Sequence, residues 1–119
     1  MAMEEFKEFP WIDPWVPVSD RGREAYQHEL RMELGLDHPL YGVQARAVAR
    51  TCHTDDILFQ LLDHDVAKFA VVHLTFRGRT EHDPQWPSVT LYRDMEHWVT
   101  QRMLRDAAAF EIDQPNQAA

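Results

Sequence analysis

The feature that most constrains the fold is a segment near the middle of the chain that is apolar on both of its alternating faces. Lys68 to Phe76 contains the run FAVVHLTF, in which His73 is the main polar interruption. Successive side chains of a β-strand point to opposite faces of a sheet, so a run of this kind is typical of a strand that is covered on each side. We therefore expect Lys68 to Phe76 to be the central member of a sheet.

Other strand signals surround this central segment. Val43 to Thr51 alternates small apolar residues with polar ones, and Ile57 to Leu62 is a second short apolar run. A polar turn at Asp63–Asp65 separates Ile57–Leu62 from the central segment, which predicts an antiparallel hairpin. Ser88 to Tyr92 has the composition of a short fourth strand. Residues 43–92 are therefore predicted to form an antiparallel sheet of three to four strands.

Amphipathic helices flank the predicted sheet. Residues 19–35 form the first helix, with Ser19 or Asp20 as its N-cap and Gly35 as a left-handed stop. Residues 94–111 form the second, which begins with a capping aspartate. The residues of its apolar face that should pack on the sheet are Met95, Val99, Met103 and Phe110. Because the strands are grouped between the helices, the predicted class is α+β.

Residues 1–18 form a segment that is both extended and apolar, which we call the arm. Pro10, Pro14 and Pro17 prevent a helix there. Its large apolar residues, which are too many for a disordered tail, are Phe6, Phe9, Trp11, Ile12, Trp15 and Val16. We expect the arm to cover apolar surface of the sheet, either in its own subunit or across a homodimer. The homodimer is preferred because two-fold dimers are the commonest oligomers.

Tryptophans beside prolines are candidate interface residues. Trp11, Trp15 and Trp86 each place a large flat ring next to rigid backbone, which suits a protein interface and equally suits the edge of a core. The chain has four tryptophans in 119 residues, so we expect at least one of them to be exposed or to line a groove.

Composition narrows the classes of protein that the chain can belong to. A length of 119 residues suits a single domain spanning 1–119, and a net charge of −8 argues against a nucleic-acid partner. The acidic excess favours solubility, with attraction to a basic partner as the alternative. We expect a cytoplasmic protein without a membrane partner. The N-terminus lacks the pattern of a signal peptide, no apolar run approaches about 20 residues, and Cys52 is the single cysteine.

His73 is the most interesting candidate for chemistry, because it lies in an otherwise apolar strand. An imidazole in such a place needs a hydrogen-bond partner, and its titration responds to the setting. Arg77 and Arg79 follow the same strand and are suited to binding a carboxylate or phosphate. The three residues are the candidate ligand-binding group, although the favoured role for His73 is that of a hydrogen-bonded structural residue, and paired arginines at the end of a strand are more often surface charge.

Two groups of histidine and aspartate resemble metal ligands in composition only. One is His53 with Asp55 and Asp56, and the other is Asp63-His64-Asp65. Both fall in predicted turns, where aspartate commonly bonds its own backbone, and no His-x-x-x-His or Cys-x-x-Cys supports them. Cys52 and His53 would point to opposite faces, so they do not predict a nucleophile and base. We therefore expect no metal, no cofactor and no catalytic residue.

A resemblance covers residues 55–103. Its motifs are Asp-Asp-Ile-Leu-Phe from Asp55, the run FAVVHLTF, the pair Trp86-Pro87 and the pair Trp98-Val99. Together they resemble small uncharacterised bacterial proteins of the α+β class. The resemblance implies a bacterial origin and carries over no functional residue.

Two functions compete on this basis. The first is a non-catalytic protein-binding module, immunity-like or accessory, which the acidic balance, the aromatic arm and the lack of a catalytic motif favour. The comparison with immunity proteins is one of size and charge, not of motif. The alternative is a small-molecule-binding protein or small enzyme with a pocket around His73 and Arg77 or Arg79. An enzyme is the less favoured of the two, and an oligomeric structural role is a third possibility.

Overall fold

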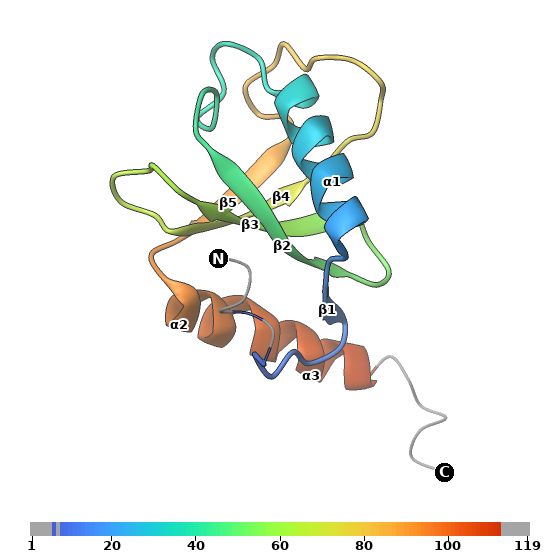
Figure 1. Ribbon diagram of the computed structural model, residues 1–119. Helices are drawn as coiled ribbons and strands as arrows, with labels where there is room; N and C mark the ends of the chain where they lie inside the picture. Colours follow the sequence, from blue (N-terminus) through green and yellow to red (C-terminus); the bar gives the residue numbers. More distant parts are fainter. Residues whose placement is uncertain (1–5, 7, 113–119) are drawn as a thin grey trace.

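A five-stranded antiparallel sheet forms the middle of the molecule (Figure 1). The computed structural model describes residue 6 and residues 8–112. The strands pair in chain order, as β1 (Trp15–Pro17), β2 (Ala45–Thr51), β3 (Asp56–Leu61), β4 (Phe69–His73) and β5 (Ser88–Tyr92). The predicted antiparallel sheet and its β3–β4 hairpin are confirmed. The sheet has five strands, however, where the sequence predicts three to four.

The additional strand comes from the arm. β1 pairs with the end of β2, where Trp15 lies opposite Thr51 and Pro17 lies opposite Ala49. Three residues are too few to show a period of two, so the sequence pattern does not reveal this strand. Because β1 extends the sheet beyond β2, the central strand is β3. The prediction that Lys68 to Phe76 is central is wrong in position, although β4 is an internal strand with Phe69, Ala70, Val71 and Val72 buried.

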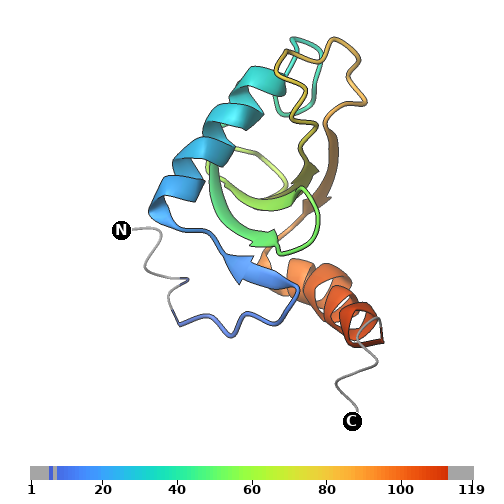
Figure 2. The same ribbon diagram turned by 90° about the vertical axis from the view of Figure 1, so that its right-hand side faces the viewer.

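Helices lie on both sides of the sheet (Figure 2), and each face of the sheet carries its own apolar core. The α1 helix (Asp20–Glu33) covers one face, where Leu30 packs with Phe59 and Val72. The arm and the C-terminal helices cover the other face, where the central residues are Trp15 and Trp98. Successive side chains of β3 and β4 therefore pack alternately into the two clusters.

The arm packs on its own subunit. Phe6 is buried and meets the ring of Phe69 edge to face, with 6.2 Å between ring centroids. Trp11 packs in the same way on Trp98 at 5.9 Å. The expectation that the arm covers apolar surface is thus confirmed within one protomer. The homodimer stays a prediction, because one subunit is sufficient for this packing.

The α1 helix begins as predicted and ends differently. Ser19 is the N-cap, and its Oγ accepts a hydrogen bond from the Gly22 N–H at 3.0 Å. The predicted left-handed stop at Gly35 is wrong, because the chain leaves the helix through an extended Leu34. Gly35 is instead needed for close packing, since a Cβ there would lie 2.5 Å from the carbonyl oxygen of Glu81.

The C-terminal helix covers the predicted region but is not one regular helix. It comprises α2 (Met95–Trp98), a π-helical turn (Val99–Met103) and α3 (Leu104–Ile112). Asp94 caps it as predicted, accepting a hydrogen bond from the His97 N–H at 2.8 Å. A π turn brings residues five apart onto one face, and it buries both Trp98 and Met103. No helix among residues 8–112 is long and apolar enough to cross a membrane.

Candidate functional site

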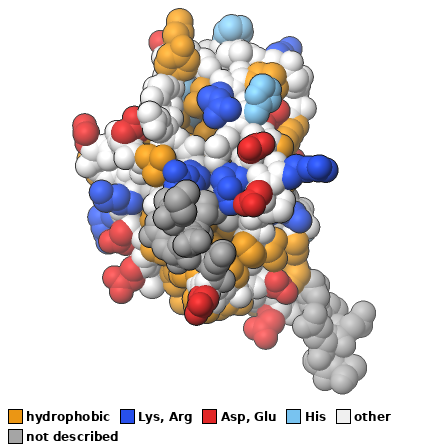
Figure 3. All heavy atoms as spheres, in the orientation of Figure 1, with side chains coloured by type: hydrophobic (Ala, Val, Ile, Leu, Met, Phe, Trp, Pro, Cys, Tyr) orange, Lys and Arg blue, Asp and Glu red, His pale blue; other side chains and the backbone are white. Residues whose placement is uncertain are grey.

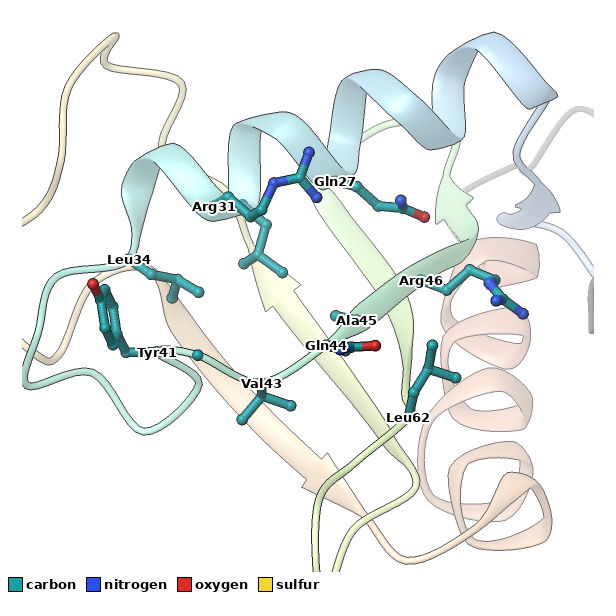
Figure 4. Close-up of a pocket in the computed structure, with 11 residues that line it drawn as sticks. Gln27, Arg31, Leu34, Tyr41, Val43, Gln44, Ala45, Arg46 and Leu62 are labelled. Atoms are coloured by element: carbon teal, nitrogen blue, oxygen red, sulfur yellow. The ribbon is translucent and has the colours of Figure 1, made fainter.

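A groove of about 570 Å³ opens between α1 and the first half of β2 (Figure 4). It is lined by Gln27, Leu30, Arg31, Leu34, Tyr41, Gly42, Val43, Gln44, Ala45, Arg46 and Leu62. One wall is helix and the other is the edge of a strand, so both side chains and main chain border the space. We take this groove as the candidate functional site and refer to it as the α1–β2 groove.

Among the residues that the structure describes, β1 pairs with only the second half of the strand edge in this groove. β1 pairs with residues 49–51 of β2, and the last contact beyond it is a hydrogen bond from the Val18 N–H to the Val48 carbonyl at 3.1 Å. The chain then turns away because Ser19 caps α1. Residues 45–47 therefore have β3 on one side and no β1 residue on the other.

The backbone of β2 directs hydrogen-bonding groups into the groove. The Leu62 N–H donates to the Gln44 carbonyl at 2.8 Å, so the main-chain groups of Gln44 and Arg46 point toward β3. By alternation, those of Ala45 and Ala47 point the other way. Gln27 of α1 already uses this orientation, because its Oε1 accepts the Ala47 N–H at 2.9 Å. The Ala45 N–H and C=O and the Ala47 C=O are thus placed to pair with a further strand.

The side chains around the groove combine an apolar wall with a basic rim. Leu30 of α1 and Leu34 just after it belong to the buried core, whereas Tyr41 and Leu62 are 52% and 45% exposed at the margins. Figure 4 shows Arg31 on the helix side and Arg46 on the strand side. The lining residues include no carboxylate, imidazole or thiol. In the space-filling view, basic side chains cross the middle of the face formed by α1 and β2, with acidic side chains beside them (Figure 3).

The residues predicted to bind a ligand make their contacts at separate places. His73 is exposed at the end of β4, and its Nδ1 lies 2.8 Å from Oδ1 of Asp56. Arg77 is exposed and reaches Glu81 at 3.4 Å in the loop beside the end of α1. Arg79 borders a hollow with Thr80, Glu81 and His82. The structure brings Arg77 and Arg79 to one loop, whereas the contacts of His73 run to β3.

His73 belongs to a polar chain that joins the sheet, the C-terminal helix and the arm. Oδ2 of Asp56 accepts a hydrogen bond from Arg102 at 3.0 Å, and Arg102 also pairs with Asp106 at 2.7 Å. Asp106 accepts the Trp15 indole N–H at 2.8 Å. Burial lowers the pKa of Arg102, but the hydrogen bond with Asp106 and the charge of Asp106 raise the pKa by more, so the net shift is upward. Both His73 and Trp15 thus have partners inside the subunit.

The tryptophans predicted as interface residues differ in exposure. Trp15 is 0% exposed and is a core residue in this subunit, and Trp11 is partly buried beside it in the arm. Trp86 is 38% exposed, which confirms the expectation that at least one tryptophan lies at the surface. Trp86 is therefore the most exposed of the three.

The histidine and aspartate groups serve the turns that contain them. Nδ1 of His64 accepts a hydrogen bond from the Ala67 N–H at 3.0 Å, and Asp63 accepts one from the Gln44 N–H at 2.8 Å. The ring of His53 packs against Phe110, with 5.5 Å between centroids. Within residues 6 and 8–112, no three His, Cys, Asp or Glu side chains gather in a way that could hold a metal ion.

A buried carboxylate that the sequence did not single out holds the loop after β4. Glu33 is fully buried, and it accepts hydrogen bonds from the backbone N–H groups of Thr75 and Phe76 at 2.9–3.0 Å. Phe76 has a φ of 52°, which is strained for a residue with a side chain. Glu33 also affects the pKa of Glu29, which lies one turn earlier in α1. The pKa of Glu29 is raised from 4.5 to about 7 by a hydrogen bond with Glu33, by burial and by the charge of Glu33.

We expect Glu29→Gln to flatten the pH dependence of stability. A carboxyl group whose pKa is higher in the folded chain stabilises the fold fully below the unfolded pKa of 4.5, and this contribution is lost as the pH rises through about 7. The wild-type melting temperature should therefore include a fall between about pH 5 and about pH 8 that the variant lacks. Thermal melts at several pH values measure this, with the exposed Glu24→Gln as the control. Equal slopes in wild type and Glu29→Gln would contradict the expectation.

No protein-family model, curated protein or solved structure matches this chain.

Proposed function

We propose that this protein is a protein-binding module that captures an extended segment of a partner protein in the α1–β2 groove. The segment adds, as a further strand, to the half of the β2 edge with which β1 does not pair within residues 6 and 8–112. The observation that supports this most directly is the orientation of the Ala45 and Ala47 backbone groups toward the groove. Addition of a strand to a sheet edge takes its affinity from main-chain hydrogen bonds and its specificity from pockets for alternate side chains.

The groove suits a peptide better than a reacting small molecule. Its lining residues offer no carboxylate, imidazole, thiol or aliphatic hydroxyl that could act as a general base or nucleophile. A peptide, in contrast, supplies its own N–H and C=O groups to match the strand. Leu30 and Leu34 would contact its apolar side chains.

The β2 edge is favoured over the other edge of the sheet. β5 also ends the sheet, and the alternation of β4 directs the Leu91 N–H outward there. The α1 helix, however, lies along the β2 edge and contacts it through Gln27. A strand added to β2 would therefore gain side-chain contacts in addition to backbone hydrogen bonds.

A selection from randomised peptides of about ten residues tests the proposal. We expect the selected peptides to change the NMR signals of residues 43–47. Ala45→Pro should weaken their binding by about tenfold or more, because it removes an outward N–H without removing a bond to β3. The matched control is Leu91→Pro, which removes an outward N–H at the β5 edge and should leave binding unchanged.

A second measurement leaves the protein unaltered. Methylating the peptide nitrogens one at a time should weaken binding at alternate positions, since every second N–H of an added strand faces β2. Binding that survives Ala45→Pro, or that shows no alternation, would overturn the proposal. Light scattering provides a further decisive outcome. A dimer that Ala45→Pro dissociates would assign this edge to a second copy of the chain instead of a partner.

A further inference from the structure

The two arginines of the α1–β2 groove stand apart from the ion pairs of the molecule. In residues 6 and 8–112, arginine ion pairs are made by Arg23, Arg77 and Arg102. Arg31 and Arg46 are outside these pairs, and no acidic residue lines the groove that they border. The chain as a whole has a net charge of −8, so the groove is a local exception to its charge.

A strand added to β2 would contact different residues on each of its two faces. Ala45 and Ala47 belong to the core beneath α1, so side chains opposite them would point toward the apolar wall at Leu30 and Leu34. Arg46 lies between these two alanines and points to the other face. A residue directly opposite Arg46 would therefore lie beside its guanidinium group, away from the helix.

We infer that the partner segment alternates apolar and acidic residues, with an aspartate or glutamate opposite Arg46. This inference rests on the proposed function. The apolar residues lie against α1, and the acidic residue forms a cross-strand ion pair with Arg46. Arg31 adds positive charge at the helix rim but does not define the register. The net negative charge of the whole chain is compatible with a basic partner. The positive charge of this groove, in contrast, favours an acidic segment.

Synthetic peptides with capped ends and three alternating Val-Glu pairs provide the probe, compared with versions that carry Gln or Lys in place of Glu. We expect the Glu peptide to bind about three- to tenfold more tightly than the Gln peptide at low salt. High salt should reduce this difference. Arg46→Gln should abolish the preference, and Arg46→Glu should transfer it to the Lys peptide. Arg105→Gln, which removes the same charge from exposed α3, is the control and should keep the preference for Glu.

The outcomes separate this inference from the function on which it rests. Equal binding of the Glu and Gln peptides, still blocked by Ala45→Pro, would overturn the acidic segment and leave strand addition intact. A preference for Glu that depends on Arg31 and not on Arg46 would overturn the register. Binding of either peptide that is insensitive to Ala45→Pro would overturn strand addition itself.

Discussion

Trp15→Ala is expected to lower the free energy of unfolding by about 3–5 kcal/mol, the usual cost of truncating a fully buried large aromatic residue. Trp15 is 0% exposed and packs edge to face on Trp98, with 5.2 Å between ring centroids. Its removal would also leave Asp106 without the indole N–H. Because Trp15 opens β1, the variant should weaken the attachment of the arm to the sheet as well.

Two variants make this result interpretable in denaturant melts. Trp86→Ala removes the same side chain from a position that is 38% exposed and should cost about 1 kcal/mol or less. Trp15→Phe keeps an aromatic ring but loses the hydrogen bond to Asp106, so its cost should lie between the two. If Trp15→Ala and Trp86→Ala destabilise the protein equally, the arm does not contribute to the core.

The parts of the fold that depend on local chemistry could be predicted from the sequence. Ser19 and Asp94 cap their helices because a side-chain oxygen next to a helix start can accept an otherwise unpaired N–H. The β3–β4 hairpin likewise follows from two apolar runs with a polar turn between them. Gly35 shows the limit of such arguments. Its role depends on the carbonyl of Glu81, which is distant in sequence, and no local pattern reveals that contact.

The candidate site could not be predicted, because it arises where strand pairing stops. The alternation from Val43 to Thr51 identifies a strand but does not say which part of its edge is covered. The covered part depends on where the chain leaves the β2 edge, which it does after Val18 to enter α1. This position is set by β1, β2 and α1 together. His73 was singled out because it interrupts an apolar run, but its partner Asp56 lies on the neighbouring strand. The polar residue in this apolar run therefore indicated a hydrogen-bond partner inside the protein, and not a ligand site.

Glu33 is a buried acidic residue whose position in the sequence offered a signal. It lies between Leu30 and Leu34, both of which belong to the core beneath α1. A carboxylate in this position must have donors, and it finds them in the Thr75 and Phe76 N–H groups. It thereby fixes the positive φ of Phe76 and the start of the loop that carries Arg77.

We expect Glu33→Gln to cost about 2–3 kcal/mol of unfolding free energy, because one of its two acceptor oxygens becomes an amide group that cannot accept the backbone N–H bonds. Amide hydrogen exchange at Thr75 and Phe76 should accelerate, which distinguishes loss of this contact from general destabilisation. The same substitution should return the pKa of Glu29 toward its ordinary value, since Glu33 supplies both the hydrogen bond and the charge that raise it. Glu24→Gln, on the exposed side of α1, is the matched control and should change none of these quantities. Unchanged exchange at Thr75 and Phe76 in Glu33→Gln would show that the loop is held by its other contacts and that Glu33 is not its clamp.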